Sequence, residues 1–313
     1  MGTPPRAQSR RADTTSLSGE RSAEWPTLAL LAVCYAAWAG VVFWLAALWL
    51  PAGIVTAMLV LALHSSLTHE AIHGHPFRNA TLNEALLFPC LGLAVPYRRF
   101  RDLHLAHHVD SRLTDPYDDP ESGYLDPAVW SGLSGPVRAL LNANNTLAGR
   151  LCLGPAIGLF FFWRGDLQAG LSGDRAVRMA WALQIPGAGI VLLAVALSPM
   201  PVWAYLVACY GAMSILKIRT FLEHRAHERA CGRTVVIEDR GPLALIFLNN
   251  NLHAVHHAHP RVAWYDLPGL WAQNRDGYLD RNDGYYYRSY REVFARHFLR
   301  AKEPVPHPLW PGE

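Results

Sequence analysis

The strongest constraint on the fold of this chain is the absence of charged residues from two long blocks of sequence. Neither Trp25–His69 nor Met179–Leu216 contains an Asp, Glu, Lys or Arg residue. A helix needs roughly 20 apolar residues to cross a bilayer, so each block is long enough for two crossings. A turn signal divides each block, between Leu50 and Gly53 in the first and between Ser198 and Pro201 in the second. We therefore predict four membrane-spanning helices, near residues 27–49, 52–69, 177–197 and 202–222.

The charge outside these blocks predicts how the spans lie in the membrane. Both turns between paired spans lack Lys and Arg, and the other segments carry nearly all of them. The positive-inside rule therefore places both termini in the cytoplasm. We expect an all-α integral membrane protein in three parts: a flexible cytosolic tail without the features of a signal peptide (1–25), a membrane domain (26–270) and a cytosolic helical cap with its tail (271–313).

Two further apolar stretches, Ala85–Tyr97 and Leu151–Trp163, are too short to cross a bilayer. Each contains a proline, Pro89 in the first and Pro155 in the second. We predict interfacial half-helices that are broken at these prolines, and packing onto the cytosolic part is the alternative.

Composition argues against several classes of function. The arginines are scattered and the net charge is only +3, so nucleic acid is not expected as a partner. The five cysteines form no CxxC pair, which argues against a disulfide framework and against an iron–sulfur cluster in this chain. The sequence also shows no flavin or dinucleotide fingerprint.

The histidines gather in three clusters, and each cluster falls on the predicted cytoplasmic side. The clusters have the patterns HxxxH, HxxHH and HxxHH, and they comprise His69, His73, His104, His107, His108, His253, His256 and His257. Residues at i, i+3 and i+4 of a helix share one face, with Cβ atoms about 5–6 Å apart. Imidazole binds iron, zinc and copper well. One HxxxH pair is more often structural, but three such clusters in one chain predict a metal site.

The order and spacing of these clusters, over residues 50–265, resemble the three histidine boxes of the membrane fatty acid desaturase superfamily, which includes hydroxylases and ketolases. The resemblance implies two irons at the cytosolic ends of four spans, with all eight box histidines as ligands. The segment Arg219–His224 is similar to the element that supplies a further ligand, so His224 becomes the ninth. Some members also place an Asn near the irons, and Asn249 is the best match, with Asn250 as runner-up.

Carboxylates next to the boxes are expected to orient the imidazoles by accepting the second ring N–H. Glu223 and Asp110 are favoured among them. The acidic, proline-containing loop 110–121 either lines a substrate entrance or lies on the surface. Six other histidines fit no box, and His64 stands out because it lies inside a span, where an ionisable group is functional or is buried with a hydrogen-bond partner.

The resemblance implies a reaction in which O2 is activated and an unactivated hydrogen is abstracted from a fatty acyl, lipid-like or smaller amphiphilic substrate. Desaturation is favoured over hydroxylation. Two electrons must come from an external donor of ferredoxin, rubredoxin or cytochrome type. The basic strip Arg98, Arg99 and Arg101 is either the docking patch for this donor or an anchor to lipid headgroups.

Two other functions fit parts of the sequence. His69–His73 is a literal HExxH, so a membrane zinc peptidase with Glu70 as general base is one alternative. A metal transporter is the other, although transporters place their ligands near the middle of the spans. Both leave the two HxxHH boxes at one end of the spans without an explanation.

Overall fold

The computed structural model describes residues 23–310, and it confirms the four predicted spans. The first is Trp25–Leu48, in which a π-helical turn, Val41–Leu45, separates α1 (Trp25–Gly40) from α2 (Ala46–Leu48). The others are α3 (Leu50–Ile72), α9 (Arg175–Ala196) and α10 (Val202–Thr220). The predicted tail 1–25 lies almost wholly outside the described residues. Helices dominate the fold, which makes this an all-α, multi-pass membrane protein.

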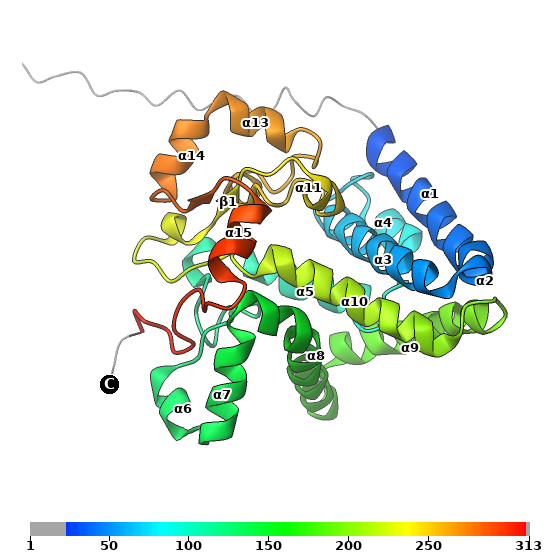
Figure 1. Ribbon diagram of the computed structural model, residues 1–313, viewed down its shortest axis with the longest axis horizontal. Helices are drawn as coiled ribbons and strands as arrows, with labels where there is room; N and C mark the ends of the chain where they lie inside the picture. The colour runs from blue at the N-terminus through cyan, green and yellow to red at the C-terminus, as the bar shows by residue number, and fades with distance from the viewer. Residues whose placement is uncertain (1–22, 311–313) are drawn as a thin grey trace, which may run out of the picture.

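Helix α3 lies between α1 and α10 (Figure 1). Small residues of α10, including Ala204, Ala208 and Ala212, are buried in this contact, which lets the two helix backbones approach closely. The outer faces carry exposed apolar side chains such as Leu48 and Leu197, which are 83% and 76% exposed. Exposed leucines of this kind suit contact with lipid chains.

The stretch Ala85–Tyr97 is not the predicted half-helix. Helix α4 (Ala80–Leu86) ends at the second residue of this stretch. The chain then stays irregular up to α5 (Tyr97–His107). Side chains bind the free carbonyls of this irregular segment: Tyr35 donates to Leu86 O (2.6 Å), Tyr205 to Leu91 O (2.8 Å), Gln184 to Leu93 O (2.6 Å) and Trp163 to Ala94 O (2.9 Å). Irregular backbone is tolerated beside membrane spans where protein groups satisfy it in this way.

The stretch Leu151–Trp163 is helical but is not broken at Pro155, so that part of the prediction is wrong. It lies inside α8 (Leu147–Leu171), which continues through the proline. The break lies before α8, where α7 (Gly135–Asn144) meets it at 115°, the geometry of a broken span or a re-entrant pair. Gly149 permits this corner, because a Cβ atom there would lie 1.8 Å from the carbonyl oxygen of Ala143.

The remaining elements form a cap over one end of the spans (Figure 1). A short parallel sheet joins β1 (Val236–Ile237) to β2 (Tyr286–Tyr287), so the end of the chain packs against the segment after α10. Buried apolar residues, among them Val255, Trp271 and Tyr278, pack three of the cap helices together. The cap helices are α11 (Pro242–Ile246), α12 (His253–Ala258), α13 (Leu267–Gln273), α14 (Arg275–Arg281) and α15 (Tyr290–His297). Helix α6 (Pro127–Gly132) lies beside α7 instead (Figure 1). The domain boundary near residue 270 stays a prediction.

Candidate metal centre

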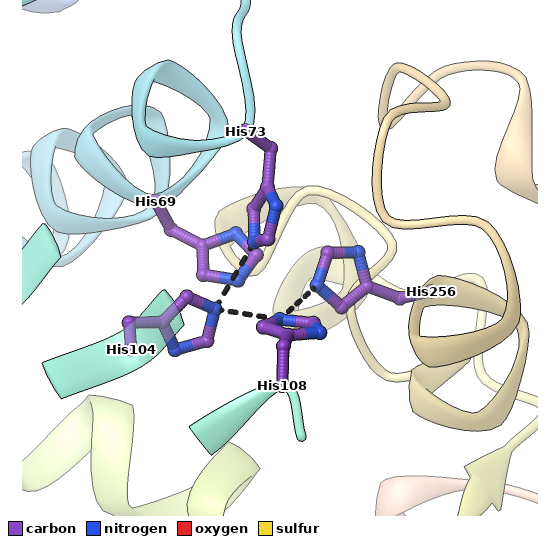
Figure 2. Close-up of side chains that lie close together, drawn as sticks. All are labelled: His69, His73, His104, His108 and His256. Carbon is purple, nitrogen blue, oxygen red and sulfur yellow. Dashed lines mark hydrogen bonds between the residues drawn. The ribbon is translucent and has the colours of Figure 1, made fainter. Parts of the chain in front are cut away.

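The fold brings all nine predicted histidines together. They come from the end of α3, from α5, from the chain after α10 and from α12. They form two groups, in each of which the ligand atoms lie within 4.8 Å of one another. The five-histidine group is His69, His73, His104, His108 and His256 (Figure 2). The four-histidine group is His107, His224, His253 and His257.

The helical spacing explains how the boxes divide. Histidines at i and i+4 of one box stay in one group, whereas His107 and His256, the i+3 members of the two HxxHH boxes, join the other group. Each residue advances a helix by about 100°, so neighbouring histidines of one helix face different directions. Helices α5 and α12 therefore each contribute to both groups, and neither group is complete without both helices.

In the five-histidine group, the Nε2 atoms converge on a common point (Figure 2). His104 Nε2 lies 3.1 Å from His73 Nε2 and 2.9 Å from His108 Nε2, and His108 Nε2 lies 3.2 Å from His256 Nε2. Nearly all of His69, His104 and His256 is buried, so little water reaches these nitrogens.

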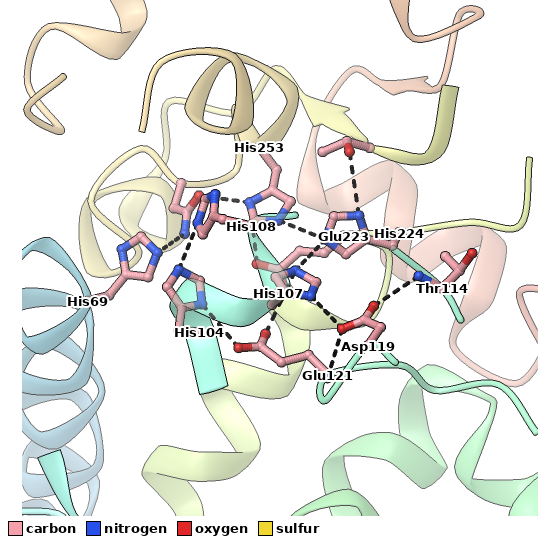
Figure 3. Close-up of polar contacts among 12 residues, drawn as sticks. His69, His104, His107, His108, Thr114, Asp119, Glu121, Glu223, His224 and His253 are labelled. Carbon is pink, nitrogen blue, oxygen red and sulfur yellow. Dashed lines mark hydrogen bonds and ion pairs between the residues drawn. The ribbon is translucent and has the colours of Figure 1, made fainter. Parts of the chain in front are cut away.

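The four-histidine group is built in the same way (Figure 3). His224 Nε2 lies 2.9 Å from His107 Nε2 and 3.2 Å from His253 Nε2. His257 packs against the other rings, with its ring centroid 4.6 Å from that of His253 and 5.0 Å from that of His224. The predicted ninth histidine, His224, is thus the central member of this group.

The opposite ring nitrogens face oxygen atoms. His104 Nδ1 donates to Glu121 (3.0 Å), and His107 Nδ1 donates to Asp119 (2.8 Å). His253 Nδ1 donates to the side-chain oxygen of Asn250 (2.9 Å), whose amide nitrogen lies 3.3 Å from His69 Nε2. Such outer partners fix the tautomer and orientation of a ligating imidazole, and here they leave the Nε2 lone pairs pointing inward.

These contacts set the electrostatics of the site. Burial lowers the pKa of His107, but the carboxylates of Glu121 and Asp119 outweigh it and raise that pKa to about 9. Burial raises the pKa of Glu121, but His107 and His104 outweigh it and lower that pKa. Burial and neighbouring rings hold the pKa values of His224, His253 and His256 well below the usual range. Most of these rings are therefore neutral, the form that binds metals.

The donor set fits two metal ions. In both groups, neighbouring Nε2 atoms lie only 2.9–3.2 Å apart. Two lone pairs at that distance repel unless a cation lies between them, and one proton does not serve three or more converging rings. Two buried groups of imidazole nitrogens are suited to two transition-metal ions.

The two candidate asparagines lie in different surroundings. Asn249 was the favoured near-metal amide, but its side chain donates to the carbonyl of Trp264 (3.0 Å), and its neighbour Asn250 contacts the histidine rings instead. The prediction assumed one helical turn before His253, whereas Leu248 and Asn249 adopt left-handed conformations (φ 51° and 56°) that turn the chain.

The predicted outer carboxylates have different outcomes. Glu223 lies 3.7 Å from His253 Nδ1 and 3.2 Å from Arg219, close to the four-histidine group. The side chain of Asp110 lies outside the described part of the structure. The predictions missed Asp119 and Glu121, which make the closest carboxylate contacts to the rings. The signal for them was the acidic loop after the second box.

The six remaining histidines lie outside both groups. His64 is buried in α3 with the Tyr35 hydroxyl 3.4 Å away, and His75 binds Glu24 (2.8 Å). The others contact cap residues: His227 meets Asp283, His259 packs on Tyr278, His297 meets Tyr287 and His307 meets Thr114.

Each arginine of the basic strip on α5 forms an ion pair with a carboxylate of this chain. Arg98 binds Glu84 (2.6 Å), Arg99 binds the buried Asp166 (2.8 Å) and Arg101 binds Asp102 (2.8 Å). These pairs neutralise much of the positive charge that a docking patch would offer. Arg99 in addition ties α5 to α8, because Asp166 is part of α8.

The fold and the histidine groups together define a multi-pass membrane protein with a buried, histidine-rich site at one end of its spans. The model of the fatty acid desaturase family matches residues 44–290, so the chain belongs to that family. Two similar curated proteins are beta-carotene ketolases of Paracoccus sp. strains N81106 / MBIC 01143 and PC1. Each is 24% identical, over 70% of this chain and 74% of its own length. Family and relatives identify an oxidoreductase.

Proposed function

We propose that this protein is an O2-dependent di-iron oxygenase that oxidises an unactivated C–H bond of a lipid-like substrate. The observation that carries the proposal is the arrangement of nine histidines as two adjacent groups of inward-facing nitrogens. Bound there, two irons would supply an oxidant strong enough for such a bond, which side chains alone do not. The five- and four-histidine groups would each hold one iron.

The chain's own residues prepare this site. Asp119, Glu121 and Asn250 hold the imidazoles in place through Nδ1, so the ligands are arranged before metal arrives. His107, His253 and His256 are buried, which limits their contact with water. The positive-inside rule supports a cytoplasmic site, where a soluble donor of ferredoxin, rubredoxin or cytochrome type delivers two electrons.

The relatives bear on the outcome of the reaction. Both relatives are named beta-carotene ketolases, and formation of a keto group requires insertion of oxygen. This similarity favours oxygen insertion over the desaturation expected from the histidine boxes. We therefore propose an apolar or amphiphilic lipid as substrate, with carotenoids among the first compounds to try.

The test is expression in a host that supplies a ferredoxin and its reductase, followed by mass spectrometry of host lipids and of added carotenoids. We expect a product that has gained oxygen and that is absent from cells expressing a His256→Ala variant. A product that has only lost two hydrogens would assign desaturation. A purified, iron-loaded protein that changes no lipid or carotenoid would contradict the proposed function.

The zinc peptidase alternative is disfavoured by the position of Glu70. Its carboxylate lies behind His69, with one oxygen 3.6 Å from Nδ1 and the other accepting the N–H of Trp264 at 3.1 Å. A general base must instead face the open side of the metal, where water binds. We infer instead that Glu70 supports His69 electrostatically from behind the ring.

A Glu70→Gln variant tests this role. Gln keeps an acceptor for the Trp264 N–H, so we expect the variant to retain iron and to lose about 10–100-fold in metal affinity or turnover, as is typical of outer partners. Iron content and product formation are compared with wild type and with His69→Ala, which removes the ring itself. Turnover as low as that of His69→Ala would show that Glu70 acts in the reaction directly.

A further inference from the structure

The last described segment of the chain returns to the metal centre. We call residues 302–307 the C-terminal strap, and the family match ends before it, at residue 290. The strap begins after α15 and runs beside α7 and the loop between α5 and α6 (Figure 1). Val305 and His307 are buried although they lie close to the end of the chain.

One end of the strap is bound to the loop that carries the outer carboxylates, residues 113–125. The Leu125 N–H donates to Val305 O (3.0 Å), and the His307 N–H donates to Leu125 O (2.8 Å). His307 Nε2 lies 3.3 Å from Thr114 Oγ1, and the Thr114 N–H donates to the Asp119 carboxylate (2.9 Å). The loop is thus fixed at both of its ends.

The other end of the strap holds the ninth histidine. The Lys302 ammonium donates to the carbonyl oxygen of His224 (2.9 Å) and lies 5.5 Å from the ring centroid of Tyr124. The Tyr124 hydroxyl accepts the N–H of Ala226, two residues after His224 (2.9 Å). Lys302 and Tyr124 together fix the short segment that carries His224, which lies outside any helix.

Both ends of the strap act on the same half of the site. The contact at His307 leads through Thr114 and Asp119 to His107, and Lys302 contacts His224 directly. His107 and His224 both belong to the four-histidine group, and their Nε2 atoms lie 2.9 Å apart.

We propose that the C-terminal strap positions the four-histidine half of the metal centre and that Lys302 is its principal positioning residue. The proposal rests on the proposed function in that it assumes two metal ions, one in each group. Lys302 contacts the segment that carries His224 and no residue of the five-histidine group, so its loss weakens one metal position and spares the other. The loop contacts are less selective, because Glu121 of the loop accepts a hydrogen bond from His104 of the five-histidine group.

The test uses the full-length purified protein with Lys302→Met, which removes the ammonium and keeps the length of the side chain. We expect iron per chain to fall from about two to about one, with the remaining iron bound as tightly as in wild type. Lys302→Arg restores a donor and should recover the second iron. Arg300→Met, which removes an exposed cation two residues away, is the matched control and should keep both irons.

Thr114→Val provides a second variant, because it removes the hydroxyl that meets His307 and keeps the side-chain shape. It should weaken the metal position of the four-histidine group more than the other, because the buried Asp119 on His107 is the carboxylate that Thr114 itself contacts. Two irons retained at wild-type affinity in both variants would overturn the proposal, as would equal loss of both irons together with a lower melting temperature of the metal-free protein. A wild-type protein that binds fewer than two metals would overturn the proposed function instead.

Discussion

Replacing His224 with alanine is expected to abolish turnover and to remove one of two irons. His224 lies at the centre of the four-histidine group, with His107 and His253 Nε2 atoms at 2.9 and 3.2 Å. Loss of this ring removes one candidate ligand of the group. The Nε2 atoms of His107 and His253 then lose the nitrogen that both of them face. We expect turnover to fall by more than the 10–100-fold that is typical for removal of an outer partner. Iron analysis and product formation measure the two effects.

The matched control for this variant is His227→Ala. His227 is three residues further along the same segment, but its ring meets Asp283 and the carbonyl of Arg229 and belongs to neither histidine group. Iron content and turnover should stay at wild-type levels. If His224→Ala keeps both irons, or if His227→Ala loses one, the assignment of the ninth ligand is wrong.

The second large effect is expected for Asp119→Asn. The Asp119 carboxylate is buried and accepts three hydrogen bonds: from His107 Nδ1 (2.8 Å), from the N–H of Thr114 (2.9 Å) and from the N–H of Glu121 (2.9 Å). Asn has the same shape, but it has one acceptor oxygen in place of two, and its NH2 group must face a donor. We expect a 10–100-fold loss of metal affinity, with larger loss at the four-histidine half.

The measurement is a titration of metal-free protein with ferrous iron, with Asp118→Asn as control. Asp118 is the preceding residue of the same loop and is exposed. Its replacement by Asn removes the same charge as Asp119→Asn does. Its variant should bind iron as wild type does. If the two variants bind iron equally well, Asp119 does not orient His107.

The spans and the histidine boxes could be predicted because both depend on short-range sequence patterns. Runs without charge, such as Trp25–His69, have few alternatives to a membrane helix, because a charged side chain in the bilayer is costly and an apolar one is not. Spacings of three and four residues place imidazoles on one helix face whatever the rest of the fold does. The structure of the short apolar stretches was harder to predict, because a proline occurs both inside helices and in irregular segments. Pro155 lies within a helix, and Pro89 lies in an irregular segment.

What the tertiary structure decided is which residues meet. His107 of the second box lies with the histidines of the third box, and His256 of the third box lies with those of the first two. This division arises because α5 and α12 both contribute side chains to each group. The choice of Asn250 over Asn249 depends on two left-handed residues that no spacing reveals. The roles of Asp119 and Lys302 depend on contacts with His107 and His224, 12 and 78 residues away in sequence. The sequence by itself determined the candidate ligand types and the end of the spans where they lie, and the packing of helices, loop and strap determined how they divide between the two histidine groups.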